Sequence, residues 1–323
     1  MPKKNSKKLE ILIIGKGSIG LRHASIFEDL GCGVSFFRTN KANLINNSSY
    51  NEYFSVDEIN ERSFDLIAIC NPSSFHVKYL KKFLHLSNNF LIEKPTCTNN
   101  KDLNFLKKIS LSKNIYSGYM LRYDKRVLEI KKKCLNTNNI NFSIFKWYTY
   151  FPDWHKYENF RNSYAANKKL GGGVIFTCSH EIDIAIFLFG RVNSVICREN
   201  KKRLNLKVEE SVSIFMKHAN GIYSLINLDF TNRELIREFK IFYKKKIIIY
   251  NFLKPNIIQD GFLKKKIIKI SKTNNIDMIY RIQNSTILKN IKNNIKISSC
   301  FDTEKVLLCC LKSLKLKKAI SVI

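Results

Sequence analysis

The sequence predicts an α/β protein with an N-terminal Rossmann domain on a parallel sheet and a C-terminal α+β domain with an open, mostly antiparallel sheet. In its first part, short apolar runs alternate with amphipathic helical stretches, a pattern typical of right-handed βαβ units. From about residue 138, strand-like runs with a period of two follow one another without helices, which favours antiparallel pairing. We therefore predict two domains, 1–122 and 123–323, with the boundary between Arg122 and Ile140.

The expected elements follow from these periodicities. In the first domain, strands are expected at 9–14, 33–37, 65–70, 89–92 and 115–119. Helices are expected at 18–30, 75–86, 101–112 and 124–135, and the stretch 56–62 is expected to form one short helix more. In the second domain, strands are expected at 141–150, 193–198, 208–217, 221–229, 237–243 and 246–251, and helices at 177–189, 277–292 and 303–317.

Composition argues against several classes of function. The 323 residues have a formal net charge of +30, but the lysines are spread through the chain, with no arginine-rich arm and no zinc-finger spacing, so we expect no specific nucleic-acid partner. Nine cysteines form no CxxC pair and no cluster of metal ligands, so we expect a reduced, cytoplasmic protein without a metal. No apolar run approaches the roughly 20 residues of a membrane helix, and the N-terminal run is too short for a signal peptide.

A glycine-rich turn follows the first apolar run. Gly15, Gly17 and Gly20 have the GxGxxG spacing of loops that hold a dinucleotide pyrophosphate. Gly15 permits the tight turn, Gly17 lets the backbone approach a phosphate, and Gly20 lets helix and strand pack closely. Ser18 and Ile19 begin the expected helix, so their N–H groups would point at the bound anion. The turn predicts a nucleotide site; an ordinary glycine-rich loop between a strand and a helix is the alternative.

The end of the second expected strand bears on the choice between NAD and NADP. An NAD-binding protein usually has an acidic residue here, which binds the 2′-hydroxyl of the ribose. This sequence instead has Arg38 and Thr39 after Phe37, and no carboxylate. These two side chains can bind a 2′-phosphate, so NADP is favoured over NAD. Alternatively, Arg38 stacks on the adenine.

Asn71 and Pro72 stop the third expected strand, and His76 follows on the next helix. At this end of a parallel sheet the three residues would lie beside the ribose and phosphates of a dinucleotide. They also make an ordinary strand end, because an Asn-Pro turn stops a strand and a following serine can cap a helix. The sequence leaves both interpretations open.

Glu93, Lys94 and Pro95 follow the fourth expected strand. Pro95 fixes the turn, so Lys94 is presented in a defined direction beside Glu93. In a partly desolvated site, the Lys94 ammonium can donate a hydrogen bond to a substrate hydroxyl and stabilise a developing alkoxide. The alternative is a solvent-exposed charged pair at a strand end.

In the second domain, three glycines at 171–173 precede a helix that is expected to present Thr177, His180 and Asp183 on one face. His180 can exchange the hydroxyl proton of a substrate, and Asp183 can orient the imidazole. The alternative is a structural polar histidine near a helix start. Upstream, the loop 153–164 is rich in aromatic and hydroxyl side chains, among them Trp154 and Tyr164, which suits either a sugar or ordinary domain packing.

Taken in order, these segments resemble the Gfo/Idh/MocA family, named for glucose–fructose oxidoreductase and inositol dehydrogenase. The matching positions are the glycine turn 15–20, Asn71-Pro72 with His76, Glu93-Lys94-Pro95, Gly118-Tyr119 with Arg122, and 171–183, and the closing stretch 302–317 is similar to the family's last helix. The resemblance implies NAD(P)-dependent oxidation or reduction of a sugar, cyclitol or related polyol. It also implies that Lys94 assists catalysis, that His180 is the acid/base, and that the exposed sheet face forms dimers or tetramers. Glu93 and Lys94 are further expected to contact the cofactor, and the expected substrate-binding residues are Arg122, Trp154, Tyr164, Thr177, His180 and Asp183.

One position departs from the family pattern. The family usually has an aspartate four residues after the triple glycine and a histidine four further on, whereas this chain has Thr177 and a histidine after only three more. The form from 171 to 183, with Trp154 and Tyr164 upstream, resembles a branch associated with bacterial surface-polysaccharide sugars. Two other functions stay open: a cofactor-retaining enzyme with a net non-redox reaction on sugars, such as glycoside cleavage, and a nucleotide-binding regulator without catalysis.

Overall fold

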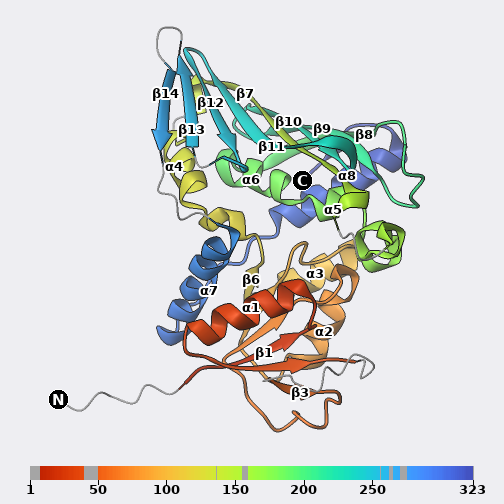
Figure 1. Ribbon diagram of the computed structural model, residues 1–323, viewed down its shortest axis with the longest axis vertical. Coiled ribbons are helices and arrows are strands. Elements are labelled where there is room, and N and C mark those ends of the chain that lie inside the picture. Colours follow the sequence, from red (N-terminus) through yellow and green to blue (C-terminus); the bar gives the residue numbers. More distant parts are fainter. Residues whose placement is uncertain are drawn as a thin grey trace, which may run out of the picture. The chain divides into compact units, whose positions relative to one another are not determined.

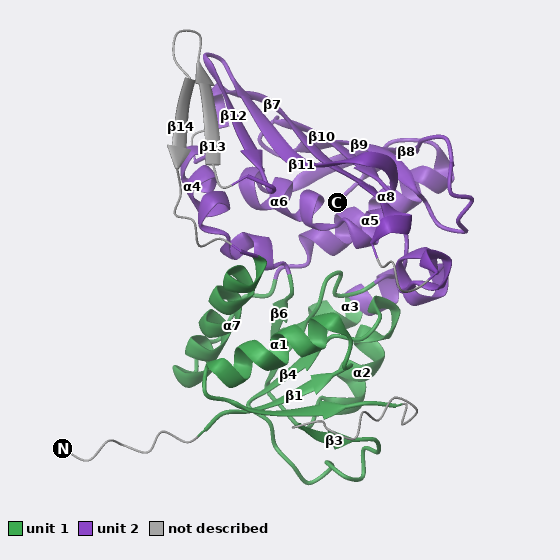
Figure 2. Cartoon of the chain, in the orientation of Figure 1, with its two compact units in different colours: residues 1–97, 104–118, 276–299 green, residues 98–103, 119–275, 300–323 purple. Residues whose placement is uncertain are grey.

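A computed structural model describes residues 8–39, 50–135, 137–154, 159–254, 256–261, 265–269 and 275–322. Contacts within the chain divide it into two compact units (Figure 2). Unit 1 is formed by Met1–Cys97, Asn104–Gly118 and Ile276–Ser299, and unit 2 by Thr98–Leu103, Tyr119–Asn275 and Cys300–Ile323. A helix from the C-terminal third of the sequence thus belongs to the first unit. The predicted division after residue 122 stays a prediction.

Unit 1 is built on a six-stranded sheet in the order β3-β2-β1-β4-β5-β6 (Figure 1). Its strands are β1 (Glu10–Ile14), β2 (Gly33–Phe37), β3 (Asn51–Tyr53), β4 (Leu66–Ile69), β5 (Asn89–Ile92) and β6 (Asn114–Ser117). Every neighbouring pair is parallel, as a Rossmann domain requires. The strand order reverses between β1 and β4, and the loops that leave these two strands therefore flank the crevice in which such sheets bind ligands.

Helices α1 (Ser18–Asp29), α2 (His76–Phe83) and α3 (Asn100–Ile109) connect strands of this sheet, and α7 (Ile276–Lys292) packs on α1. β1 and β4 are almost wholly apolar because both faces of a parallel sheet are covered. The core joins Ala24 and Phe27 of α1 to Ile287 and Leu288 of α7. The late helix α7 therefore completes a core that the first hundred residues begin.

Unit 2 contains a nine-stranded sheet in the order β14-β13-β12-β11-β7-β10-β9-β8-β15. The strands are β7 (Ile140–Tyr150), β8 (Val192–Glu199), β9 (Ser211–His218), β10 (Tyr223–Asp229), β11 (Thr231–Tyr243), β12 (Lys246–Asn251), β13 (Asn256–Gly261), β14 (Lys265–Lys269) and β15 (Ile320–Ser321). The pair β7–β10 is parallel and the other pairs are antiparallel, so the predicted mostly antiparallel sheet is confirmed.

One face of this sheet is covered by α5 (Val174–Thr177), α6 (His180–Phe189) and α8 (Asp302–Leu316), while α4 (Lys125–Lys133) precedes β7 (Figure 1). Except for Phe187, every residue of α6 is buried, so it is a core helix of the unit. Along the described stretches of the chain, no single helix is long and apolar enough to span a membrane. The bent pair 168–177 and 180–189 meets that test only when both helices are taken together.

Two expected elements differ from the structure. The stretch 56–62 forms turns instead of a helix, because so short a segment gains too few helical bonds to offset nucleation, and the Glu58 carboxylate accepts the N–H of Phe54 just before it. β3 precedes these turns in the sequence, and this strand was not expected. The helix predicted at 177–189 is two helices, because the backbone leaves the helical conformation at Cys178. Thr177 therefore ends α5 and does not share a helical face with His180 and Asp183.

Candidate active site

The glycine loop of unit 1 forms a cradle made of backbone. Gly15 has φ +99°, and a Cβ added to Gly20 would lie 2.0 Å from the carbonyl oxygen of Gly15, so strand, turn and helix pack too closely for a side chain. At Gly17 the situation is reversed, because a Cβ there would meet no atom within 4 Å. Ser18 and Ile19 follow as the first residues of α1, and no side chain caps this helix end. The loop is thus closed toward the protein and open at the helix N-terminus, where an anion binds.

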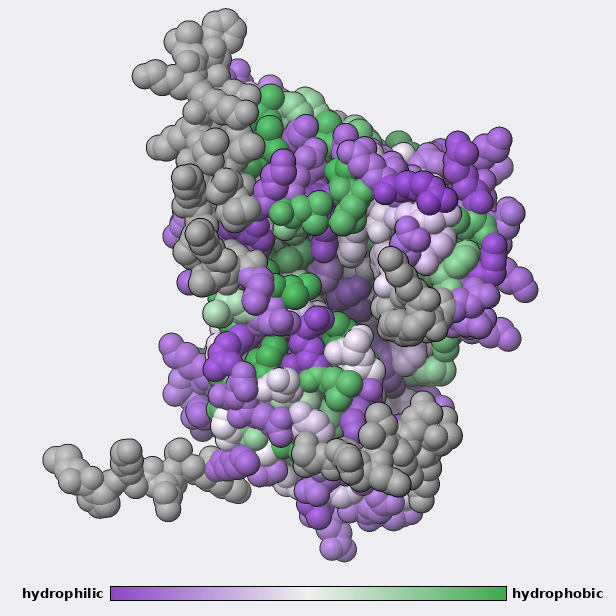
Figure 3. Space-filling view, in the orientation of Figure 1, coloured by the Kyte–Doolittle hydropathy of each residue, from purple (hydrophilic) through white to green (hydrophobic). Residues whose placement is uncertain are grey.

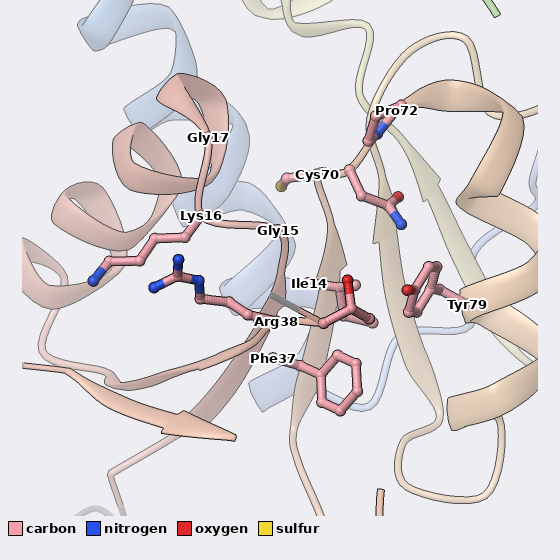
Figure 4. A pocket seen from close by; sticks show the side chains of 11 residues that line it. Ile14, Gly15, Lys16, Gly17, Phe37, Arg38, Cys70, Pro72 and Tyr79 are labelled. Atoms are coloured by element: carbon pink, nitrogen blue, oxygen red, sulfur yellow. The ribbon is translucent and has the colours of Figure 1, made fainter. Parts of the chain in front are cut away.

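A pocket of about 280 Å³ opens beside this loop (Figure 4). Its lining includes Gly17, Arg38, Thr39, Asn71 and Pro72, all of which were predicted to bind the cofactor. The Asn71 side-chain oxygen is buried and accepts no hydrogen bond from the residues that the structure describes. A buried acceptor without a donor is costly, so this oxygen can accept a hydrogen bond from a bound ligand. The open cradle and this acceptor fit a dinucleotide, with phosphates at Gly17 and a hydroxyl or amide donor at Asn71.

Two cations of the pocket share one carboxylate. Lys16 extends from the glycine loop and Arg38 from the end of β2, and the two side chains lie near each other (Figure 4). Arg38 Nη1 donates to Glu52 Oε2 at 2.7 Å, and the ammonium of Lys16 pairs with the other oxygen of Glu52. Glu52 lies on β3, the strand that the sequence analysis did not expect. The sequence has no carboxylate at the end of β2, but the pairing of β3 with β2 brings the Glu52 carboxylate next to it.

His76 is buried, and each of its ring nitrogens lies next to a backbone carbonyl oxygen: Nδ1 is 2.9 Å from Pro95 O, and Nε2 is 2.8 Å from Asn71 O. A neutral imidazole donates through one nitrogen only. Burial lowers the pKa of His76, although the two carbonyl groups oppose that shift. The ring thus links the loop after β4 to the loop after β5. Its contact with a cofactor stays a prediction.

Glu93 and Lys94 follow β5 in a tightly packed turn. Glu93 is buried, and its Oε1 lies 3.0 Å from Nε2 of His23 on α1, whose Nδ1 lies 3.0 Å from the side-chain nitrogen of Asn284 on α7. With Asn284 donating to Nδ1, the N–H at Nε2 donates to Glu93. A Cβ on Gly118 would come within 2.8 Å of Glu93 Cα, so only glycine fits there. Glu93 also accepts the N–H of Lys94 at 3.2 Å, so α1 and α7 fix the backbone that presents Lys94.

In unit 2, Gly173 and Glu209 set the start of α5. Gly173 has φ +109°, and its N–H donates to Ala165 O at 2.8 Å. Glu209 accepts the N–H of Ile175 at 3.3 Å, and a Cβ on Gly173 would collide with the Glu209 carboxylate. Burial raises the pKa of Glu209 to about 7. The triple glycine therefore allows the Glu209 carboxylate to approach the backbone of Gly173 closely within unit 2. This contact precedes in sequence the helix that begins at His180.

His180 lies in a buried aromatic and acidic environment. Its side chain is almost fully buried, and its ring meets that of Tyr119 edge to face with the centroids 5.9 Å apart. The Tyr119 hydroxyl donates to Glu304 Oε1 on α8 at 3.1 Å. Burial, followed by the Glu304 charge, raises the pKa of Tyr119 well above its ordinary value, so this phenol stays protonated as a donor. Tyr119 thus links the predicted acid/base to Glu304, and the three residues come from distant parts of the sequence.

Asp183 is one turn beyond His180 and binds Arg122 through two hydrogen bonds. Arg122 Nε donates to Oδ2 at 3.0 Å and Nη2 donates to Oδ1 at 2.6 Å, while the Thr303 hydroxyl donates to Oδ1 at 2.8 Å. Burial raises the pKa of Asp183, against the opposing effect of Arg122. Two predicted substrate-binding residues, Arg122 and Asp183, are thus brought together. The resulting fork is rigid because Arg–carboxylate pairs of this kind fix both partners.

The remaining predicted substrate residues lie in different settings. The Trp154 indole N–H donates to Thr149 Oγ1 at 2.7 Å, and its ring stacks on Trp147 at 6.3 Å. Tyr164 is exposed on the surface, and Thr177 is buried at the end of α5. Residues 155–158 of the loop 153–164 lie outside the described residues. Among those that are described, no group of three His, Cys, Asp or Glu side chains could hold a metal ion, and the nine cysteines are free thiols.

Two family models match the chain. The model of the oxidoreductase family with an NAD-binding Rossmann fold matches residues 9–116. The model of the GFO/IDH/MocA C-terminal domain matches residues 144–248, so the two halves of one family are found in the expected order. The chain belongs to the Gfo/Idh/MocA family. The predicted resemblance is thereby confirmed, and with it the assignment to NAD-binding oxidoreductases.

Several solved structures of this family have the same fold. A levoglucosan dehydrogenase in complex with NADH and L-sorbose has a TM-score of 0.84 at 16% identity, covering 98% of this chain and 100% of that one. A myo-inositol dehydrogenase from Corynebacterium glutamicum has 0.76 at 17%, covering 98% and 99%. The WlbA dehydrogenase from Chromobacterium violaceum, in complex with NADH and UDP-GlcNAcA, has 0.79 at 15%, covering 99% and 98%. A search of curated proteins found no significant match.

In this family member, several functional neighbours were missed by sequence reasoning. Glu52, His23, Asn284 and Glu304 each contact a predicted site residue or its support, yet each lies far from it in sequence. In a further pair, the partly buried Arg237 donates to the buried Glu181, the residue after His180, at 2.7 Å. Carboxylates within largely apolar stretches were the available signal: Glu181 and Glu304 are fully buried in α6 and α8, next to the buried polar residues His180 and Thr303. Such carboxylates are buried only when paired.

Proposed function

We propose that the protein transfers a hydride between a nicotinamide dinucleotide and the hydroxyl or carbonyl carbon of a sugar, sugar derivative or polyol. The observation that carries this proposal is the open glycine cradle with the unsatisfied acceptor of Asn71 beside it. The family membership and the NADH-bound relatives support it. The reaction class is that of a dehydrogenase or reductase acting on CH–OH groups.

The side chains of the two units then take distinct roles. Nicotinamide, when bound, supplies the site that accepts or gives the hydride. Lys94 donates a hydrogen bond to the reacting oxygen and stabilises charge that develops on it. His180 takes up the hydroxyl proton during oxidation and returns it during reduction. The Arg122–Asp183 fork presents fixed donors to further substrate hydroxyls, and Trp154, Tyr164 and Thr177 complete the substrate contacts.

NADP is the cofactor that we propose in preference to NAD. Lys16 and Arg38 both pair with the carboxylate of Glu52 and both line the pocket beside the glycine loop. A 2′-phosphate can bind both cations, whereas a ribose hydroxyl would accept or donate one hydrogen bond there. Glu52 competes with that phosphate for the same donors. The expected preference is therefore modest, and NAD binds as well.

The open face of the unit 2 sheet supports assembly into a homodimer or homotetramer. Phe142 stacks on Phe242 at 4.3 Å and Phe215 on Tyr223 at 5.0 Å, and both Phe142 and Phe215 are exposed. Figure 3 shows hydrophobic residues among hydrophilic ones over the strands of this unit on the face in view. Exposed apolar surface of this kind marks a protein interface. We also propose a cytoplasmic location and, from the pattern at 171–183, a place in making surface polysaccharides.

Replacement of Lys94 and His180 tests the proposal. Lys94→Ala should lower kcat at least about 100-fold, since a positioned hydrogen-bond or proton-transfer group contributes that much. NADPH binding, followed by nicotinamide fluorescence, should survive. His180→Ala should behave likewise. Because both groups act on one hydroxyl, the double variant should lose much less than the product of the two single losses.

The assay uses a panel of sugars and polyols and follows the absorbance of the reduced nicotinamide. If the loss of kcat in the double variant equalled the product of the two single losses, Lys94 and His180 would not act on one hydroxyl. Full turnover in Lys94→Ala would remove this residue from the mechanism. Tight cofactor binding with no redox change on any substrate would favour the regulator, and a non-redox product with unchanged cofactor would favour the cofactor-retaining enzyme.

A further inference from the structure

Unit 2 has an open basic pocket with no part in the roles proposed above. Its volume is about 800 Å³, and four of the residues that line it are cations: Arg161, Lys168, Lys169 and Lys207. No acidic side chain is among the described residues of the lining. Cations that share a cavity without a facing carboxylate repel one another. An anionic ligand would relieve this repulsion.

The wall that carries Lys207 is held in place from below. The Glu210 carboxylate is fully buried beneath the loop between β8 and β9 and accepts three backbone N–H groups, from Arg203 at 2.8 Å, Leu204 at 2.8 Å and Leu206 at 2.6 Å. A carboxylate with this many charge-assisted hydrogen bonds fixes the backbone that it binds. Asn205, in the centre of the loop, has φ +56°, a conformation that such a framework maintains. The loop is therefore preorganised.

The opposite wall, which carries Lys168 and Lys169, is fixed as well. The Asn167 side chain accepts the N–H of Lys169 at 2.9 Å, and the N–H of Gly172 donates to Asn167 O at 3.0 Å. Arg161 Nη1 donates to Leu204 O at 2.9 Å and so joins this wall to the loop of Lys207. The cations thus stand on two short segments tied to each other. The fold therefore sets the spacing of the backbone positions from which these cations extend.

Size and lining chemistry narrow the class of ligand. Ligand pockets in proteins typically measure about 300 to 1,000 Å³, so this cavity has room for far more than one phosphate. Its buried floor includes Ala166 and Leu206, which offer apolar surface to a ribose or base. A guanidinium with several ammonium groups suits the oxygens of adjacent phosphates. A nucleoside diphosphate matches this lining, because its phosphates carry a compact negative charge and its base is flat and partly apolar.

We propose that this pocket binds the nucleoside diphosphate part of a ligand. Arg161, Lys168, Lys169 and Lys207 contact the phosphates, and Ala166 and Leu206 contact the nucleoside. The ligand is either a free nucleotide or the carrier end of a sugar nucleotide, which share this chemistry. The binding does not depend on hydride transfer, so it stands or falls separately from the proposed enzyme activity.

Calorimetric titration of the full chain tests the site. The protein is saturated with NADH, which fills the cradle of unit 1, and then titrated with uridine diphosphate at about 0.15 M salt, which screens diffuse charge attraction. The paired variant Lys168→Glu/Lys207→Glu should weaken binding at least about tenfold, the value of one lost charge-assisted hydrogen bond. The milder variant Lys168→Gln/Lys207→Gln should also weaken the binding of uridine diphosphate. It tests the site even if the charge-reversal variant does not fold.

Lys312→Glu/Lys318→Glu is the matched control, since it makes the same change of charge on exposed residues of unit 2 outside the pocket. It should leave the affinity nearly unchanged. Equal losses in both charge-reversal variants would mean attraction to the basic chain as a whole and would overturn the proposal, as would the absence of binding to the wild type. UDP-glucose separates the two sources: affinity equal to that of uridine diphosphate assigns a sugar nucleotide, and a large loss assigns the free nucleotide.

Discussion

In unit 1 the cradle between β1 and α1 is made of backbone, whereas in unit 2 the surroundings of His180 are made of buried side chains. The cradle needs three glycines within six residues, and the ion pair of its Lys16 with Glu52 lies outside the backbone that forms it. His180 and Asp183 instead depend on partners separated from them by much of the sequence: Arg122 is 61 positions from Asp183, and Thr303 is 120 positions away. Glu304 reaches Tyr119 across 185 positions.

This difference predicts two kinds of sensitivity. A cradle made of backbone loses its function when a side chain is added, because the added atoms take up space that is needed by the ligand or by neighbouring backbone. A cluster of buried charges fails when one partner is removed, because the other charge is left without compensation. The first change should affect ligand binding, and the second should affect the stability of the unit that contains it.

Removal of the Asp183 carboxylate should have the largest effect. Asp183→Ala leaves the mostly buried guanidinium of Arg122 without its partner, so the free energy of unfolding should fall by about 3 kcal/mol or more. Both tryptophans of the chain, Trp147 and Trp154, lie in unit 2, so tryptophan fluorescence during urea unfolding reports on this unit. NADPH binding to unit 1 should change little.

Asp183→Asn is the matched control for this prediction. It keeps the shape and one acceptor for Arg122 and Thr303, so its loss of stability should be clearly smaller. An unchanged urea midpoint in Asp183→Ala would show that the Arg122–Asp183 pair does not stabilise unit 2. An equal loss of NADPH affinity in both variants would show that the two units respond as one.

Addition of a methyl group to the cradle should have the second largest effect. In Gly17→Ala the new Cβ meets no protein atom, so thermal stability should be kept, while NADPH affinity should fall about tenfold because the methyl group takes the place of a phosphate. In Gly20→Ala the Cβ strikes the carbonyl of Gly15, so stability and affinity should both fall. Undiminished NADPH binding by Gly17→Ala would place the phosphates elsewhere.

The same contrast explains how much could be predicted from the sequence. Most of the strands and helices and the glycine cradle depend on short-range patterns and were predicted within a few residues, whereas β3, β13, β14 and β15 were not expected. The helix at 177–189 was expected to be continuous because its periodicity runs across Cys178, where the backbone turns. Thr177 was therefore assigned to the wrong face.

The partners of the site residues could not be predicted in this way. Nothing in the sequence near Arg38 points to Glu52, because their contact depends on β3 pairing with β2. The contact of Asn284 with His23 likewise depends on α7 packing on α1. A single sequence shows which residues are chemically able to act, and the fold decides which of them meet.

Neutralisation of Glu52 should have the smallest effect of the series and tests this point directly. Glu52→Gln removes the carboxylate charge with which Arg38 and Lys16 both pair, so both become more available to a 2′-phosphate. The ratio of NADPH affinity to NADH affinity should rise about fivefold, equal to about 1 kcal/mol, as for a partly exposed ion pair. Fluorescence titration with both nucleotides measures it, and Glu61→Gln, an exposed glutamate of the same unit, is the control. A ratio that falls would mean that Glu52 positions the two cations for the phosphate instead of competing with it.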